Sequence, residues 1–412
     1  MQPKAIDKRW IVAILVIIMT LRIVSYFMLS ESVMITRSIK IGLRIILSAY
    51  CVLLYLKERK FQSSTGFKTV AGLPIFFYLA YLALGISSLL WSSAAGYSAL
   101  QLIMDIECVI FVHYFWKLLL LWQNRISTET PLLLIGRVLG VATGIITVVF
   151  LIGMNIDPDT FYRSTHGGEI ARLGGFIINP NELGMLLVIG CAGMYIDGFK
   201  HRFNIWKMVL ITLMAYALFL TGSRSSLGSF VLVSGIFIMS LGNLRLRLGL
   251  VLGGVAATPV ILKEVIFKQG NVEEVMSMTG RLPFWSDLLT YGFPQEPFLG
   301  FGFMRIAYAD KFASLHAYDG AMTHNTFLQV LLNLGLIGAC IVFLQMLFTF
   351  HAVIQEKSIW VKRTFIGLFI PLFINSLTEF GIFGETNYGI MFYLICLYMI
   401  SIKIDNKYVA HA

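Results

Sequence analysis

The chain has 412 residues, of which 58% are hydrophobic and only 13% are charged. A mean hydropathy of +0.80 excludes an ordinary soluble protein, which needs more polar surface at this length. The net charge of +10 does not indicate nucleic-acid binding, because membrane proteins collect Lys and Arg in their cytoplasmic loops. These values favour a polytopic, all-α integral membrane protein.

Apolar runs of about 20 residues recur along the whole sequence, and each is long enough to cross the hydrocarbon core of a bilayer. We expect about twelve transmembrane helices in a single membrane domain over residues 1–412. The basic start of the chain runs into an apolar segment without a small-residue cleavage site, which predicts a first spanning helix rather than a cleaved signal. The expected spans are residues 10–29, 38–56, 69–91, 99–122, 131–154, 182–198, 205–221, 225–241, 246–263, 326–349, 364–383 and 388–404.

Alternate loops carry the basic residues, which predicts that these loops and both termini are cytoplasmic. The opposite loops are short except for residues 155–179 and a long polar segment, 267–323, within the large external loop 264–325. The basic clusters include Lys4, Lys8 and Arg9, then Lys57, Arg59 and Lys60, then Lys200, Arg202 and Lys207, then Arg245 and Arg247, and finally Lys357, Lys362, Arg363, Lys403 and Lys407.

The large external loop is rich in aromatic residues and glycine. This composition is typical of a folded cap that lies on the membrane face and binds a ligand. Pro283 favours a short helix through residues 284–289. Residues 300–303 are expected to form a turn, and residues 305–316 an amphipathic interfacial helix.

The five cysteines all fall in apolar runs and lack the spacing of a metal site, so we expect them to pack as small apolar groups. The predicted external segments have no Asp-x-Asp pattern or carboxylate cluster of the kind that binds Mg²⁺ or Mn²⁺. We therefore predict neither a metal nor a cofactor.

Four polar features fall at or near predicted helix starts on the external side. The first is Arg172, followed by Asn179, Pro180 and Glu182. Asn179 is suited to cap a helix, Pro180 to its first position and Glu182 to the third residue after the cap. Such a helix start attracts phosphate. Arg172 is either a phosphate ligand or an interfacial arginine that reaches water.

The second feature is the hairpin Thr221–Gly222–Ser223–Arg224, where an arginine at the membrane boundary needs a partner or a polar cavity. This favours a functional role for Arg224. The third is Arg281, in the segment before Pro283. On its chemistry alone, a single loop arginine is an ordinary solvent-exposed residue.

The fourth feature is His324–Asn325, immediately before the apolar run 326–349. A helix N-terminus disfavours imidazolium, so this position favours a neutral histidine that is able to accept a proton. The functional interpretation is a general base. The alternative is a surface histidine that is hydrogen-bonded to its neighbour.

Four acidic residues lie in or beside the spans. Asp105 and Glu107 are interpreted as internal partners of Arg137 or Arg22 rather than as a proton relay. Glu379 and Glu385 lie at the outer end of a span, and they are expected to pair with the external arginines.

These features together resemble the superfamily of O-antigen ligases and O-antigen or capsule polymerases. His324–Asn325, nine residues, then Gly335–Leu336–Ile337–Gly338 match the His-[Asn/Ser/Gln]-x9-Gly-x-x-[Gly/Thr/Tyr] pattern of the ligases. Three further elements, in the same order as in that superfamily, are Arg172–Leu173–Gly174–Gly175–Phe176 with Asn179–Pro180–Asn181, then Thr221–Gly222–Ser223–Arg224, then Gly280–Arg281 with Trp285 and Pro297–Phe303. The resemblance covers about residues 145–345.

The resemblance implies an inverting, metal-independent glycosyltransferase of the bacterial cytoplasmic membrane whose active site faces the periplasm. The implied donor is a glycan on undecaprenyl diphosphate. His324 is implied as the base, and Arg172, Arg224 and Arg281 as ligands of the diphosphate. Asn325, Asn181 and Ser223 are expected to support them.

Two acceptors remain open. The Thr-Gly-Ser-Arg hairpin and the Pro-x-Leu-Gly-Phe-Gly-Phe segment favour a polymerase, whose acceptor is another lipid-linked repeat and which implies a partner that regulates chain length. The His-Asn-x9-Gly-x-x-Gly pattern favours a ligase, whose acceptor is lipid A–core. A lipid-linked oligosaccharide flippase is a more distant alternative, although its unusual charges would follow a central path rather than gather at one face. Membrane lipids are expected partners, and nucleic acid is not.

Overall fold

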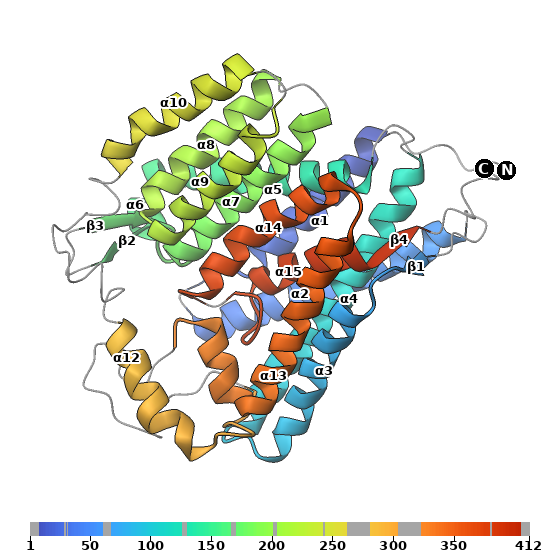
Figure 1. Cartoon of the computed structure of the whole chain (residues 1–412), viewed down its shortest axis with the longest axis vertical. Coiled ribbons are helices and arrows are strands. Elements are labelled where there is room, and N and C mark those ends of the chain that lie inside the picture. The colour runs from blue at the N-terminus through green and yellow to red at the C-terminus, as the bar shows by residue number, and fades with distance from the viewer. Residues whose placement is uncertain are drawn as a thin grey trace.

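A computed structural model of the chain is an assembly of long helices with two small two-stranded β-sheets (Figure 1). The structure describes residues 8–28, 30, 32–60, 67–125, 130–165, 170–200, 204–241, 244–261, 281–303, 323–379 and 381–404. The predicted interfacial helix at residues 305–316 lies outside the described residues, as does most of the large external loop.

The described elements follow one another from the N-terminus in this order. They are α1 (Lys8–Val24), α2 (Val33–Arg59), β1 (Phe67–Thr69), α3 (Leu73–Ser87), η1 (Ser88–Leu90), α4 (Ala95–Arg125), α5 (Pro131–Ile156), α6 (Pro158–Phe161), β2 (Tyr162–Thr165), β3 (Ile170–Leu173), α7 (Pro180–Lys200), α8 (Ile205–Thr221), α9 (Arg224–Ile238), α10 (Leu244–Ile261), α12 (Arg281–Asp287), the π-helical turn η3 (Leu288–Gly292), η4 (Phe293–Gln295), α13 (Thr326–Gln355), α14 (Ile359–Ser376), α15 (Tyr388–Ser401) and β4 (Ile402–Ile404).

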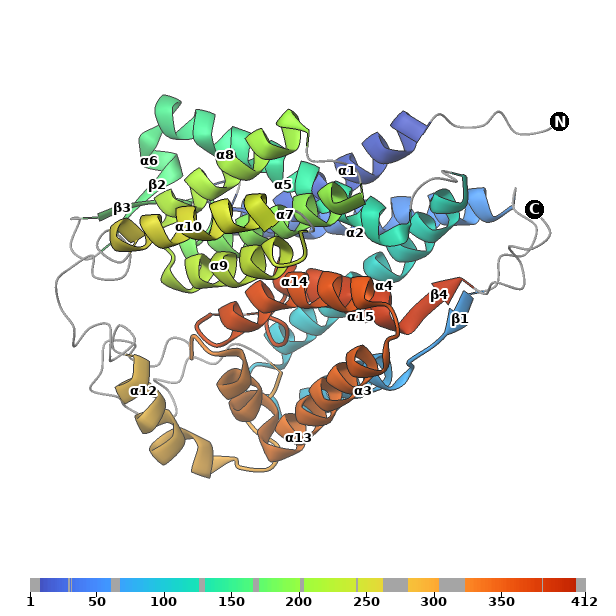
Figure 2. The ribbon, with the colours of Figure 1, turned by 45° about the horizontal axis from the view of Figure 1, so that its top comes forward.

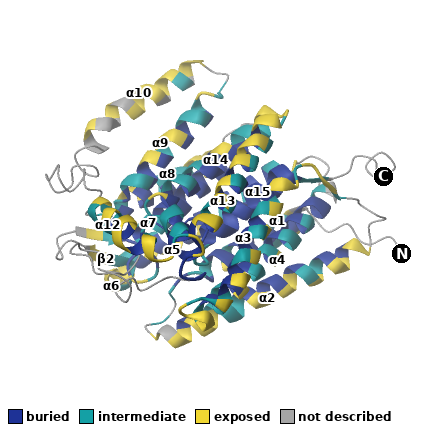
Figure 3. Cartoon of the chain, turned by 60° about the horizontal axis from the view of Figure 1, so that its bottom comes forward, coloured by how far each residue is buried: buried dark blue, intermediate teal, exposed yellow. Residues whose placement is uncertain are grey.

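Each expected span overlaps one of the long helices. Among the described residues, six helices are both long and apolar enough to cross a membrane: α2, α3 with η1, α4, α5, α13 and α14. Helices α8, α9 and α15 are apolar but shorter. Exposed residues lie along the outer faces of α2 and α10, whereas buried residues fill the middle of the assembly (Figure 3). The all-α membrane class predicted from composition agrees with this architecture.

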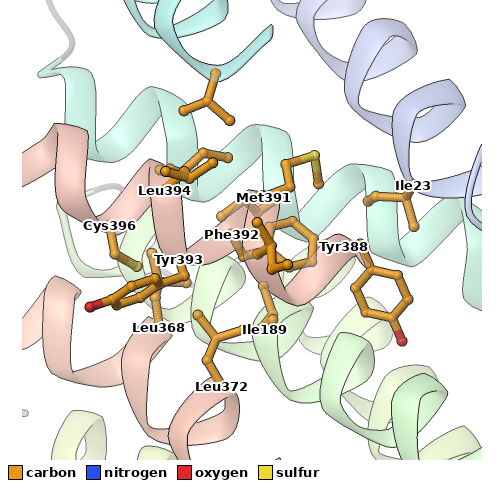
Figure 4. Close-up of a cluster of buried hydrophobic side chains, with 14 of the residues drawn as sticks. Ile23, Ile189, Leu368, Leu372, Tyr388, Met391, Phe392, Tyr393, Leu394 and Cys396 are labelled. Atoms are coloured by element: carbon orange, nitrogen blue, oxygen red, sulfur yellow. The ribbon is translucent and has the colours of Figure 1, made fainter. Parts of the chain in front are cut away.

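Helix α15 lies at the centre of the assembly. All of its 14 residues are buried, as expected of a helix that is apolar on every side. Side chains from three other helices pack around it (Figure 4). They include Ile23 of α1, Ile189 of α7, and Leu368 and Leu372 of α14. The segment just before α15 is thereby held against the core.

Helices α5 and α7 approach each other closely through glycines. A Cβ atom added at Gly193 of α7 would lie 2.6 Å from the backbone oxygen of Gly136 and 2.7 Å from the backbone nitrogen of Gly140, both on α5. Small residues at a four-residue spacing allow such contact between membrane helices. This contact holds α7 against α5. The first turn of α7 follows the segment that contains Arg172 in the chain.

The buried charges inside the bundle pair with one another. Glu107 of α4 accepts two hydrogen bonds from Arg22, at 2.7 and 2.8 Å, and one from Arg44 at 3.2 Å. The predicted pairing of Glu107 with Arg22 is therefore correct. The predicted alternative, Arg137, is wrong, because Arg137 instead pairs with Asp197 of α7 at 2.8 Å. Burial favours such pairing because an isolated charge in the bilayer is costly.

The two small sheets lie far apart in the structure (Figures 1 and 2). Strands β2 and β3 pair antiparallel between α6 and α7, and Arg163 lies directly opposite Arg172. Strands β1 and β4 also pair antiparallel, and Lys68 lies opposite Lys403. The β1–β4 pair joins the α2–α3 connection to the end of α15.

Helix α13 is broken at Gly335, which has φ 60° and ψ −160° (Figure 2). Residues on either side of the break bond to the Pro297–Gly302 segment of the external loop. Leu336 N donates to Pro297 O at 2.9 Å, and Gly302 N donates to Asn333 O at 2.9 Å. A Cβ atom at Gly335 would lie 2.2 Å from the backbone of Phe298. Glycine is required there by both the left-handed φ and the close contact.

The predicted elements of the external loop agree with the structure where it is described. The short helix α12 begins at Arg281, two residues before Pro283, so Arg281 is a helical residue rather than a loop residue. The predicted turn at 300–303 contains Gly300 and Gly302, which have φ values of 65° and 111°. This turn is the part of the loop that lies against the break in α13.

Candidate active site

The site is centred on Glu379, which lies in the turn after α14 and is only 4% exposed. Its carboxylate contacts residues from three distant parts of the chain. Oε2 lies 2.9 Å from Nδ1 of His324, and Oε1 accepts from Nη2 of Arg281 at 2.9 Å and from Nδ2 of Asn181 at 2.8 Å. Three of the predicted site residues, His324, Arg281 and Asn181, are therefore joined by one carboxylate.

Burial alone raises the pKa of the Glu379 carboxyl, but the hydrogen bond from His324 and the charge of Arg281 hold that pKa below its usual range. Glu379 is therefore ionised at neutral pH. The predicted pairing of Glu379 with an external arginine is correct. Glu385, by contrast, accepts a hydrogen bond from the hydroxyl of Tyr97 at 2.8 Å.

His324 has a backbone conformation that is uncommon for a residue with a side chain. Its φ is 47°, in the left-handed region. Asn325, in an extended conformation, then caps α13 by accepting from the backbone N–H groups of Phe327 and Leu328 at 2.9 and 3.1 Å. Conformations of this kind persist where surrounding contacts hold them and are common at functional sites.

Several contacts hold the His324 segment against the Glu379 turn. Thr326 Oγ1 donates to Glu379 O at 3.2 Å and accepts from Gly381 N at 2.8 Å. Asn325 Nδ2 donates to Leu377 O at 3.3 Å. The indole of Trp285 in α12 donates to the carbonyl of Thr323. The imidazole is thus positioned by its own segment, by the turn after α14 and by α12.

A bond from Nδ1–H to the carboxylate fixes the tautomer of a neutral imidazole and leaves Nε2 as the proton acceptor. The contact between Nδ1 of His324 and Glu379 therefore leaves Nε2 as the ring nitrogen for a proton transfer. The base role of His324 stays a prediction, and the structure adds to it a carboxylate contact that the sequence did not predict.

Arg172 joins the same network from β3. Its Nε donates to Thr221 O at 2.7 Å, and its Nη2 donates to Asn181 Oδ1 at 2.7 Å. Asn181 therefore bridges Arg172 and Glu379. The Asn179 side chain accepts from the backbone N–H of Asn181 at 2.9 Å, and α7 begins at Pro180, as predicted.

Arg224 is the first residue of α9, and Ser223 is its N-cap. The Oγ of Ser223 accepts from the backbone N–H of Ser226, whose own hydroxyl donates to Asn181 O at 3.3 Å. The predicted hairpin therefore adjoins the start of α7. Its turn depends on Gly222, which ends α8 with φ 58°.

Positive charge accumulates around Arg172. The pKa of Arg172 is lowered to about 10, mainly by burial; Glu379 opposes this shift, and the neighbouring Arg224, Arg163 and Arg281 add to it. Arg172 remains charged at neutral pH, but it lies among three like charges. Such a group favours binding of a polyvalent anion.

Two features of this site were not predicted from the sequence, the contact of Glu379 with His324 and the position of Arg163. Glu379 was expected to pair with an external arginine, but it lies in a turn 55 residues after His324, and no sequence pattern joins the two residues. Arg163 is brought beside Arg172 by strand register alone. A basic residue on each side of a short hairpin is a weak sequence signal, and the pairing register decides which residues meet.

The family comparison agrees with the motifs. The family model described as O-antigen ligase matches residues 208–343, a range that includes Arg224, Arg281, His324 and the α13 break. Arg172 lies before the matched range and Glu379 after it. No curated protein gives a significant match to the chain. The match to residues 208–343 covers three of the four motifs and supports the membership of this chain in the superfamily of O-antigen ligases and polymerases.

Proposed function

We propose that the protein is an inverting glycosyltransferase that transfers a glycan from undecaprenyl diphosphate to a sugar hydroxyl at the external face of the cytoplasmic membrane. One observation carries the proposal. The oriented His324–Glu379 pair lies in one hydrogen-bonded network with Arg281 and Arg172, beside further arginines. A base and an anion site are the two groups that this reaction requires.

In the proposed reaction, Nε2 of His324 takes the proton from the acceptor hydroxyl as the oxygen attacks the anomeric carbon. A carbon–oxygen bond forms on one face of the sugar while the bond to the diphosphate oxygen breaks on the other. The configuration at that carbon is inverted, and the lipid diphosphate leaves with the bonding electrons. Glu379 stabilises the imidazolium that forms, because its carboxylate faces Nδ1.

The arginines stabilise the charge that develops on the leaving diphosphate. Their guanidinium groups suit phosphate oxygens because each presents several N–H donors in a fixed plane. The bonds from Arg172 to Thr221 and Asn181, and from Arg281 to Glu379, fix both side chains before substrate binds. Little reorganisation is then needed during the reaction.

Arg163→Ala tests the anion site at a position outside the motifs. Arg163 is exposed and lies opposite Arg172 on the same face of the β2–β3 hairpin. We expect KM for the lipid-diphosphate donor to rise roughly two- to fivefold, with little change in kcat, because an exposed charge contributes modestly to binding. Steady-state kinetics in detergent or nanodiscs measure both.

The matched control is Ser164→Ala, the next residue of the same strand, whose side chain points to the other face. Thermal unfolding distinguishes an effect of the substitution on donor binding from an effect on the stability of the protein. Like charges directly opposite each other destabilise a hairpin, so Arg163→Ala should not lower Tm in the absence of donor. A lowered Tm with unchanged KM would assign Arg163 a structural role instead.

We propose polymerisation of lipid-linked repeat units as the reaction, on the basis of the Thr221–Arg224 hairpin and the Pro297–Phe303 segment. The second candidate is ligation of the glycan to lipid A–core, which the description of the matched family model favours. Both candidates use the same base and the same anion site, and they differ in the acceptor that reaches His324.

The test is incubation of purified protein with a synthetic undecaprenyl-diphosphate repeat unit, with and without a core oligosaccharide. Polymerisation predicts a ladder of lengthened lipid-linked products without any core acceptor. Transfer only in the presence of core would establish ligation instead. If neither incubation forms a glycosidic bond, glycosyl transfer is contradicted, and a transport role for the lipid-linked glycan becomes the better interpretation.

A further inference from the structure

A cavity of about 530 Å³ lies at the opposite end of α13 from His324. It is bordered by the start of α3, the last turns of α13, the connection to α14, and the end of α15 with β4. The lining residues are Val70, Ala71, Gly72, Leu73, Pro74, Phe348, His351, Ala352, Gln355, Glu356, Lys357, Ile400 and Lys403. The cavity therefore shares no residue with the candidate active site.

One part of the cavity lining is apolar and continues onto the outside of the bundle. Leu73 and Phe348 contribute to the lining itself. Beside them, α13 presents Leu347, Phe350 and Ile354 outward, with exposed fractions of 49%, 41% and 69%. An apolar stripe on a membrane helix is the surface that acyl chains contact.

The other part of the lining is cationic. Lys357 is exposed, and Lys403 pairs with Glu356, which also accepts from the backbone N–H of Ser358 at 3.0 Å. Lys68 is outside this lining, but it lies directly opposite Lys403 where β1 pairs antiparallel with β4. Like charges placed opposite each other weaken strand pairing. Three lysines against one carboxylate leave an excess of positive charge beside an apolar wall.

We propose that this cavity binds the headgroup of an anionic phospholipid. The phosphate lies between Lys68, Lys357 and Lys403, and one acyl chain follows the outer apolar stripe of α13. A free phosphate satisfies the lysines but leaves the apolar wall uncovered, whereas a phospholipid satisfies both parts. Basic residues at a membrane surface attract anionic lipids in this way. The site is independent of the glycosyltransferase proposal.

The test compares the full chain in nanodiscs of phosphatidylcholine alone and of phosphatidylcholine with phosphatidylglycerol. Retained lipid is read by native mass spectrometry, and stability by thermal unfolding. The test variant is Lys68→Ala with Lys357→Ala. The matched control is Lys57→Ala with Lys60→Ala, which removes the same charge from exposed residues at the end of α2, outside the cavity lining.

We expect the wild type and the control variant to retain phosphatidylglycerol and to show a higher Tm in its presence. The test variant should lose roughly fivefold in affinity for each lysine removed, and most of the Tm shift. Lys357→Arg, which keeps the charge, should behave as the wild type and exclude a folding defect as the cause.

Three outcomes would overturn the proposal. In the first, the wild type retains no phosphatidylglycerol. In the second, both double variants lose phosphatidylglycerol equally, which would indicate an effect of general surface charge. In the third, inorganic phosphate added to phosphatidylcholine nanodiscs reproduces the full Tm shift, which would indicate a site for free phosphate.

Discussion

Replacing His324 with alanine should lower the rate of glycan transfer by about 10²–10⁴-fold, the usual cost of losing a general base. Without the imidazole, the acceptor hydroxyl keeps its proton during attack on the anomeric carbon. The effect should appear in kcat, since the arginines that hold the donor are unchanged. Single-turnover transfer from a lipid-diphosphate donor measures it directly.

The control for His324→Ala is the affinity for the lipid-diphosphate donor, which should remain within a few-fold of the wild-type value. The variant also removes one hydrogen bond to Glu379, so its Tm must be compared with that of the wild type. Transfer at a near wild-type rate by a folded, purified His324→Ala protein would contradict the proposed mechanism. Failure of donor binding alone would instead assign His324 to the anion site.

The sequence predicts the helices well, because an apolar run of about 20 residues has few alternatives to a buried or membrane-spanning helix. It also predicts local features that depend on adjacent residues. Asn179 caps α7, Pro180 begins it, and Gly222 ends α8, as their residue types require. In each case the physical cause lies within a few residues of the feature.

The sequence does not predict contacts that join distant segments. The Gly335 position of the His-Asn-x9-Gly motif looks like a helix packing residue. In the structure it breaks α13 so that the Pro297–Gly302 segment bonds to both sides of the break. This reason for glycine depends on backbone from 33 or more residues earlier, which no local pattern encodes. Arg163 shows a different limit, because it lies close to Arg172 in the chain but only the register of the hairpin decides that the two residues face each other.

Asp105 and Arg137 show a related limit. Both are intramembrane charges, and the need for a partner is predictable from the cost of burial. The identity of the partner is not predictable in the same way, since Arg137 pairs with Asp197 of α7 rather than with a carboxylate of α4. Asp105 accepts instead from the hydroxyl of Thr386. Sequence reasoning thus establishes that pairs exist, and packing decides which groups form them.

Replacing Glu379 with glutamine should reduce transfer nearly as much as replacing His324, by roughly 10²-fold or more. In the proposed mechanism the carboxylate accepts from Nδ1–H of His324, so that Nε2 is the nitrogen that takes the proton. A glutamine amide that donates to Nδ1 stabilises the opposite tautomer, in which Nε2 carries the hydrogen and is unable to act as a base. The loss should appear mainly in kcat, measured with saturating donor.

Two measurements separate this orienting role from a purely structural one. Glu379→Asp keeps the charge and should recover part of the activity, whereas a role in packing alone predicts no recovery. The second measurement is stability against pH. Because the pKa of Glu379 is held below the ordinary value of about 4.3, its ionised form stabilises the wild type above that pH. This stabilisation is lost as pH falls through the lower native value. Glu379→Gln should lack that acid-dependent loss. If it keeps both the wild-type acid profile and the wild-type rate, Glu379 does not orient His324, and the base must be held by the Thr323–Thr326 segment alone.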